Sequence, residues 1–213
     1  MTIRAVLARS PVIPVLTIED AAMATDLAGA LIAGGLPVIE ITLRTEAGLE
    51  AVSRVAKAFP EASVGVGTVL DEADFARARD AGAVFAVSPG LVPEMAGAAN
   101  AAGIAFLPGV QTSSEIMTAR RLGLDTLKFF PAEASGGVYG LKQFAPVYPD
   151  VVFCPTGGLT LQNAPDYLAC PNVICIGGGM ATPADALAAQ DWDAIRRTAA
   201  VAAGLARSCL AAA

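Results

Sequence analysis

The sequence predicts a single (β/α)8 barrel domain over residues 1–213, and three observations indicate this fold class. The chain has 213 residues, fewer than the roughly 250 to 300 at which chains begin to divide into domains. Eight short apolar segments start 21 to 26 residues apart, which leaves room for one helix after each strand. The segments are almost continuously apolar, as is typical of parallel strands covered by helices. The alternative is a doubly wound open sheet.

Eight segments are the expected strands, each bounded by turn residues. In chain order they are VIPVLT (12–17), VIEITL (38–43), SVGVGT (63–68), VFAVSP (84–89), AFLPGV (105–110), TLKFFP (126–131), VVFCPT (151–156) and VICIGG (173–178).

Helices are expected between these strands, several of them opened by a capping residue. Thr17 precedes an apolar-periodic segment, and Thr112 or Ser113 precedes another. The segment 191–207 is the expected last helix. Residues 1–11 are interpreted as a short lead-in, and 208–213 as a frayed tail.

Composition limits the possible functions. The chain contains no histidine, which removes the commonest general base, the commonest metal ligand and every His-dependent triad. We therefore expect no metal. We also expect no cofactor, because the lysine considered below can itself serve as an electron sink. A net charge of −6 argues against nucleic acid as a partner. No apolar run is long enough for a membrane span and the first residues do not form a signal peptide, so we expect a cytoplasmic protein with reduced cysteines.

Two ionisable residues lie inside the expected strands. Lys128 stands between Leu127 and Phe129, and Glu40 stands in VIEITL. A buried lysine loses hydration unless it has partners, so its neutral amine becomes available as a nucleophile. If both side chains point into the barrel they converge, and Glu40 becomes a candidate general acid/base. The alternatives are a snorkelling lysine or a purely structural ion pair between the two.

Other candidates follow the carboxyl ends of the expected strands, where barrels carry their function. Arg44 could hold a substrate carboxylate, or could pair with Glu46 or Glu50. Thr68 and Pro89 could shape the mouth or serve only as turn residues. The last two strands end in glycine-rich loops, the usual phosphate site of this fold. These loops contain Thr156, Gly157, Gly158, Gly177, Gly178 and Gly179.

The stretch 12–207 resembles the 2-keto-3-deoxy-6-phosphogluconate (KDPG) aldolases, which overlap with the 4-hydroxy-2-oxoglutarate (KHG) aldolases. The motifs that carry the resemblance are VIEITLRT, VGVGTVL, FAVSPGL, FLPGV, LKFFPAEASGG, FCPTGGL and CIGG. The resemblance implies a class I aldolase on a (β/α)8 barrel that forms homotrimers and needs no metal.

The resemblance also implies roles for individual residues. Lys128 would be the Schiff-base lysine and Glu40 the proton shuttle, while Arg44 and Thr68 would hold the pyruvate carboxylate. The remaining assignments are Pro89 and Phe130 in the pocket wall, Thr156, Gly157 and Gly158 near the distal end of the substrate, and Gly177, Gly178 and Gly179 at the phosphate.

The sequence departs from the family pattern at one position. Gly179 stands where members that act on the phosphorylated sugar acid often have serine, which removes one possible hydrogen bond to the distal part of the substrate. We expect KDPG as the substrate, cleaved to pyruvate and glyceraldehyde 3-phosphate. The alternatives are KHG, cleaved to pyruvate and glyoxylate, a stereoisomeric keto-deoxy-phosphosugar acid, or a sugar-phosphate isomerase or epimerase barrel without lysine chemistry. A non-catalytic metabolite-binding module is a further alternative.

Overall fold

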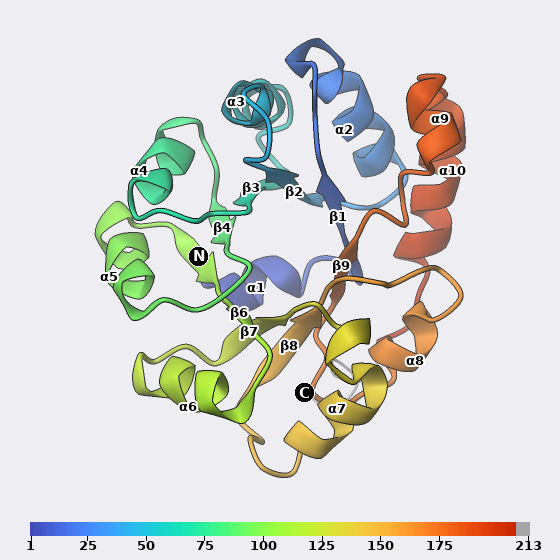
Figure 1. Ribbon diagram of the computed structural model, residues 1–213. Helices are drawn as coiled ribbons and strands as arrows, with labels where there is room; N and C mark the ends of the chain where they lie inside the picture. Colours follow the sequence, from blue (N-terminus) through green and yellow to red (C-terminus); the bar gives the residue numbers. More distant parts are fainter. Residues whose placement is uncertain (208–213) are drawn as a thin grey trace.

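The computed structural model describes residues 1–207 and has an α/β fold in which every strand pairing is parallel. Figure 1 shows the strands arranged around a common centre with most of the helices outside them. The strands are β1 (Val12–Leu16), β2 (Val38–Thr42), β3 (Ser63–Gly67), β4 (Phe85–Val87), β5 (Ala105–Leu107), β6 (Gly109–Val110), β7 (Thr126–Phe129), β8 (Val152–Pro155) and β9 (Ile176–Gly178).

The strands form two hydrogen-bonded sheets. One has the order β5-β4-β3-β2-β1-β9 and the other the order β6-β7-β8. The extended segment 105–110 contributes to both, because β5 pairs with β4 and β6 pairs with β7. Pro108, which has no N–H, separates β5 from β6, although its carbonyl accepts a hydrogen bond from the Lys128 N–H. Isolated bridges join Phe153 to Val173 and Thr156 to Gly177, between β8 and the β9 segment.

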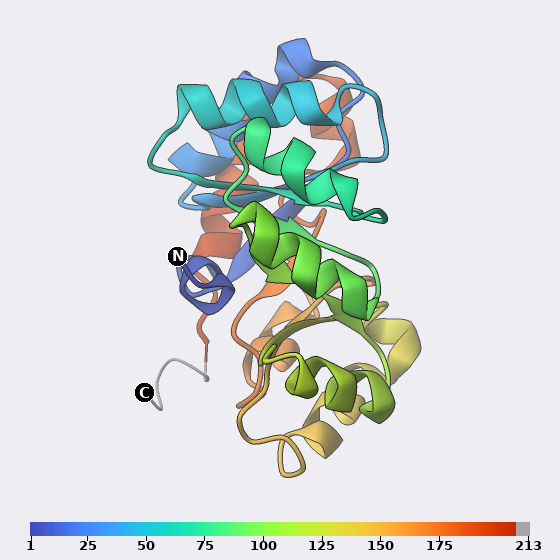
Figure 2. The same ribbon diagram turned by 90° about the vertical axis from the view of Figure 1, so that its left-hand side faces the viewer.

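Helices connect successive strands except β5 and β6, and α3, α4 and α5 follow one another along one side of the molecule (Figure 2). The α-helices are α1 (Ile3–Leu7), α2 (Ala24–Ala33), α3 (Gly48–Ala58), α4 (Ala73–Asp80), α5 (Pro93–Ala102), α6 (Ser113–Arg121), α7 (Gly137–Phe144), α8 (Ala164–Leu168), α9 (Ala184–Ala188) and α10 (Trp192–Ala203). Two 3-10 turns are η1 (Ala21–Met23) and η2 (Glu133–Ser135).

Alternation along the strands divides the apolar core in two. On β2, Val38 belongs to an inner cluster, whereas Ile39 and Ile41 face outward and pack in the layer between strands and helices. The inner cluster also contains Phe85 and, from α1, the completely buried Leu7. The segment interpreted as a short lead-in therefore contains a helix whose apolar face packs against the inside of the strands.

All eight expected strand segments contain strands, with the fifth divided by Pro108. Thr17 does not cap a helix: Asp20 caps η1, and the Thr17 hydroxyl hydrogen-bonds to Thr42 instead. Asp20, three residues later, caps the helix instead because its carboxylate accepts a hydrogen bond from the Ala22 N–H.

The two other expected helix starts are present. Thr112 forms a capping box with Glu115, and Asp191 caps α10, which ends at Ala203, four residues before the expected end. The expected frayed tail, 208–213, lies outside the described residues. Cys154, Cys170 and Cys175 are buried, as expected for core thiols. Among residues 1–207 no helix has both the length and the apolar character needed to cross a bilayer.

Candidate active site

Lys128 and Glu40 meet on the inner side of the strands. Lys128 Nζ lies 3.6 Å from Glu40 Oε1, and the two residues are only 5% and 3% exposed. They come from β7 and β2, which belong to different sheets, so their approach depends on the tertiary fold. The predicted convergence of the two side chains is confirmed. A buried cation and anion in contact stabilise one another, which both a catalytic pair and a structural ion pair require.

Glycine on a neighbouring strand makes room for Glu40. Residue Thr42 of β2 pairs in register with Gly67 of β3, and a Cβ at Gly67 would overlap the Glu40 carboxylate. Sequence reasoning missed this function of Gly67. The signal was present in the alternating glycines of VGVG, because glycine inside a strand often marks the close approach of another group.

Aromatic and proline residues lie beside this pair. The Lys128 ammonium is 5.0 Å from the centroid of the half-buried Phe130 ring, within the range of a cation–π attraction. Pro89 follows β4, and a Cβ at Gly109 would overlap the Pro89 backbone. Phe130 thus contacts Lys128 directly. Pro89 packs against β6, the strand that pairs with β7.

Arg44 and Thr68 form a second polar pair, on the loops after β2 and β3. Arg44 Nε donates a 3.0 Å hydrogen bond to Thr68 Oγ1. The alternative partner Glu50 instead pairs with Arg54 at 2.6 Å. Thr68 has a φ of +60°, which is unusual for a β-branched residue and stores strain of the kind that gathers at functional sites. The backbone therefore holds the Thr68 hydroxyl where an unstrained residue would not place it.

Thr156 and the glycine loops lie after β8 and β9. Thr156 is 7% exposed, and a Cβ at Gly177 would come within 2.5 Å of its hydroxyl oxygen. Gly157 and Gly158 have φ values of +100° and +81°. Gly177 and Gly178 end β9, and the exposed Gly179 follows them. The predicted site residues thus lie within the strands or follow their carboxyl ends.

A pair of threonine hydroxyls at the same end was not singled out from the sequence. Thr17 Oγ1 and Thr42 Oγ1 are 3.0 Å apart, and Thr42 is completely buried. No motif marks them, because threonine is common in strands and strand ends for reasons of packing alone. Within residues 1–207, no group of three or more His, Cys, Asp or Glu side chains could hold a metal ion.

Comparison with known proteins identifies the family to which the chain belongs. The family model described as KDPG and KHG aldolase matches residues 3–198. The chain belongs to this aldolase family. The 2-dehydro-3-deoxy-phosphogluconate aldolase of Pseudoalteromonas atlantica is 47% identical over 190 residues, which cover 89% of this chain and 88% of that protein. The KHG/KDPG aldolase of Escherichia coli K12 is 47% identical over 194 residues, which cover 91% of each.

Solved structures extend the agreement to three dimensions. KDPG aldolase from Legionella pneumophila, with pyruvate captured as a covalent carbinolamine intermediate, superposes with a TM-score of 0.92 at 41% identity, covering 94% of this chain and 98% of that one. The Zymomonas mobilis ATCC 29191 enzyme superposes with a TM-score of 0.93 at 44% identity, covering 98% and 100%. The predicted family is confirmed, and the chain is an aldolase, an enzyme of the lyase class.

Proposed function

We propose that Lys128 of this aldolase attacks C2 of a 4-hydroxy-2-keto acid and forms a Schiff base. The observation that carries the proposal is the buried lysine in contact with one carboxylate. Lys57 and Lys142, the other lysines, lie on α3 and α7. Attack by the neutral amine gives a carbinolamine, loss of water gives an iminium ion, and that ion accepts the electron pair of the breaking C3–C4 bond.

Glu40 is proposed as the general acid/base of this sequence. Directly or through a water, its carboxylate takes the proton of the C4 hydroxyl as the C3–C4 bond breaks and the aldehyde leaves. The remaining enamine is protonated at C3, and hydrolysis of the iminium ion releases pyruvate and restores the amine. No electron acceptor is needed beyond the lysine adduct, so we propose that the enzyme works without a cofactor.

The carboxylate of the keto acid is proposed to bind at Arg44 and Thr68. Their hydrogen bond presents a guanidinium group and a hydroxyl side by side on adjacent loops. Arginine suits this task because its planar fork matches a carboxylate. Phe130 and Pro89 are proposed to form the apolar wall of the same pocket.

The distal end of the substrate is proposed to lie at Thr156 and the two glycine loops, where Gly157, Gly158, Gly177, Gly178 and Gly179 would surround a phosphate. We propose KDPG as the substrate, with glyceraldehyde 3-phosphate as the aldehyde product. Gly179 offers no hydroxyl to this end, so KHG, or a stereoisomer of the phosphorylated acid, is the alternative.

The experiment is reduction with borohydride in the presence of pyruvate, followed by intact mass and peptide mapping. We expect one stable pyruvate adduct on Lys128, none on a Lys128→Ala variant, and an unchanged adduct on the control Lys142→Ala. An unmodified mass would favour the isomerase or epimerase alternative, in which Lys128 only supports charge. Rates of pyruvate release from KDPG and KHG, measured side by side, then choose the substrate.

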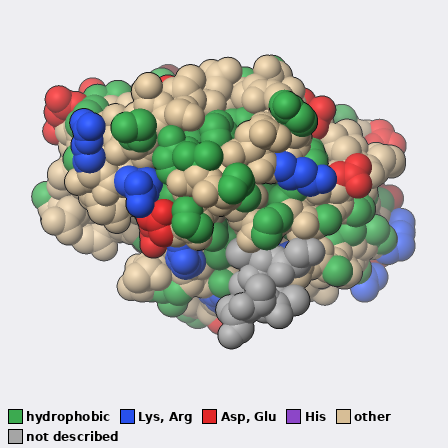
Figure 3. Space-filling model, turned by 90° about the horizontal axis from the view of Figure 1, so that it is seen from below, with side chains coloured by type: hydrophobic (Ala, Val, Ile, Leu, Met, Phe, Trp, Pro, Cys, Tyr) green, Lys and Arg blue, Asp and Glu red, His purple; other side chains and the backbone are tan. Residues whose placement is uncertain are grey.

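We further propose that the strands close into one (β/α)8 barrel domain. Two features support closure over a doubly wound sheet: segment 105–110 joins the two sheets on one side, and the bridges between β8 and the β9 segment join them on the other. A homotrimer in the cytoplasm is the proposed form. Apolar side chains are visible on the side seen in Figure 3. Exposed apolar residues elsewhere in the described chain that could serve an interface include Val147 and Val201.

A further inference from the structure

Two hydrogen bonds fix the orientation of the peptide groups in the loop 157–159, which follows β8. The Gly157 carbonyl accepts a hydrogen bond from the Glu133 N–H at 3.2 Å. The Gly158 carbonyl accepts one from Asn163 Nδ2 at 3.3 Å. Both acceptors therefore point toward the part of the protein formed by η2 and the start of α8.

The opposite sides of the same peptide groups carry N–H donors. In a trans peptide the N–H points away from the carbonyl, so the N–H groups of Gly158 and Leu159 point away from Glu133 and Asn163. Among the described residues neither N–H has a protein acceptor. Successive free N–H groups next to glycines of positive φ form a concavity that binds anions. The orientation of the Gly157 and Gly158 carbonyl groups thus decides whether the N–H groups of the loop can bind an anion.

Asn163 is itself held by two hydrogen bonds with Thr160. Its Oδ1 accepts a 2.8 Å hydrogen bond from the Thr160 N–H, and its own N–H donates to Thr160 Oγ1 at 3.3 Å. With Oδ1 engaged in this way, the amide nitrogen is the atom that faces Gly158. The side chain therefore acts as a bridge between the loop and the start of α8.

Glu133 is fixed by Tyr167. The Tyr167 hydroxyl donates a hydrogen bond to Glu133 Oε1, and Tyr167 is only 1% exposed. Burial, followed by the Glu133 carboxylate, raises the pKa of Tyr167 far above its usual value, so the phenol remains a donor. A Cβ at Gly158 would lie 2.6 Å from Glu133 Cγ, so the loop and Glu133 are in close contact.

We infer that Asn163 and Tyr167 are positioning residues for a substrate phosphate, Asn163 directly and Tyr167 through Glu133. This inference rests on the proposed function, because it assigns the loop to the phosphorylated end of the aldolase substrate. The two residues touch no reacting atom. Their effect is to keep the N–H groups of Gly158 and Leu159 turned toward the anion.

The test compares Asn163→Ala and Tyr167→Phe with matched controls in the intact enzyme. Asn100→Ala and Tyr139→Phe remove the same groups from exposed positions, where neither side chain makes a hydrogen bond within residues 1–207. For each variant, kcat/KM is measured on KDPG and on KHG, together with competitive inhibition by inorganic phosphate. Thermal unfolding monitors the fold.

Each positioning variant should lower the ratio of the KDPG to the KHG kcat/KM by roughly three- to tenfold, the effect of one lost hydrogen bond. The inhibition constant of phosphate should rise by a similar factor, and the controls should match wild type. An equal fall of kcat/KM on both substrates would show that these residues have only a structural role, and it would overturn the inference. If Tyr167→Phe does not fold, the half-buried Asn163 carries the test alone.

The proposed function fails separately. Absence of a pyruvate adduct on Lys128 would sink the lysine mechanism whatever the ratio does. A wild-type enzyme that forms the adduct but neither prefers KDPG nor is inhibited by phosphate would overturn this inference and the phosphate assignment, while leaving the lysine mechanism in place.

Discussion

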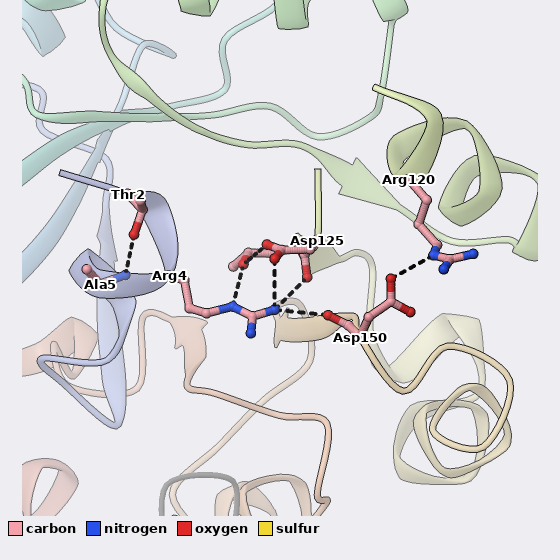
Figure 4. A network of polar contacts seen from close by, with 7 residues as sticks. Thr2, Arg4, Ala5, Arg120, Asp125 and Asp150 are labelled. Carbon is pink, nitrogen blue, oxygen red and sulfur yellow. Dashed lines mark hydrogen bonds and ion pairs between the residues drawn. The ribbon is translucent and has the colours of Figure 1, made fainter. Parts of the chain in front are cut away.

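The two ends of the strands carry their charges in different ways. At the amino-terminal end, α1 and the turn after it supply Arg4 and Arg9, whose guanidinium groups hydrogen-bond to the Thr126 and Ser63 hydroxyls at 3.3 and 2.5 Å. Arg4 also reaches Asp125 and the Asp150 backbone, and Arg120 pairs with the Asp150 carboxylate (Figure 4). These cations are partly exposed and bind groups that begin or precede strands.

The carboxyl-terminal end contains a buried ion pair and a strained residue instead. Lys128 and Glu40 are almost inaccessible, and Thr68 adopts a positive φ. Both features cost free energy that only a well-packed surrounding structure can supply. The comparison indicates that one end of the fold is arranged for stability and the other for chemistry. Three predictions test that division, and a fourth concerns the stability of α6.

The largest effect is expected for Glu40→Gln. The amide fits the space left by Gly67 but can no longer take the C4 proton, so kcat should fall by roughly 10²- to 10⁴-fold. Steady-state pyruvate release measures it, with Glu50→Gln as the exposed control. A variant with kcat near that of wild type would remove Glu40 from the mechanism.

Thr68→Gly should weaken binding of the keto acid without lowering stability. Glycine relieves a left-handed strain of about 1 to 2 kcal/mol, which offsets its greater flexibility in the unfolded chain, so the Tm should not fall. The lost hydroxyl should raise KM for the keto acid about three- to tenfold. A lower Tm with an unchanged KM would show that Thr68 serves the turn alone.

Arg4→Ala should affect stability and spare catalysis. The variant loses an exposed ion pair and three hydrogen bonds, which together stabilise the fold by about 1 kcal/mol. Urea unfolding measures this loss, and kcat/KM should stay within about twofold, the size of a small surface effect. Arg121→Ala is the control, because within residues 1–207 its side chain makes no hydrogen bond or ion pair. A large loss of activity would contradict the division between the two ends.

The smallest effect concerns Glu115, at the start of α6. Partial burial raises the pKa of Glu115, but hydrogen bonds from the Gln111 and Thr112 N–H groups and the Thr112 hydroxyl outweigh burial and leave the pKa below its usual value. A lowered carboxyl pKa stabilises the fold above the unfolded pKa, and this contribution is lost as pH falls through the folded value. Wild type should therefore exceed Glu115→Gln in stability at pH 7, and the difference should shrink towards pH 3. A difference independent of pH would refute this.

The sequence was sufficient to predict the strands and the central pair. Lys128 and Glu40 were identifiable because charge on an apolar strand is rare and has few explanations. The helix start at Asp20 was missed because several residues nearby are good caps and only the local backbone chooses among them. Asn163 and Tyr167 could not be predicted, since their role depends on which peptide oxygen each contacts or supports in the folded chain.

The space at Gly67 has a consequence for how this enzyme can vary. One hydrogen atom in place of a methyl group on β3 sets the position of a carboxylate that belongs to β2. A mutational survey restricted to charged and polar side chains would overlook this residue, although the conservative change to alanine there displaces Glu40. Variant libraries of the aldolase should therefore change Gly67 and Glu40 together, because the position of the carboxylate depends on the glycine.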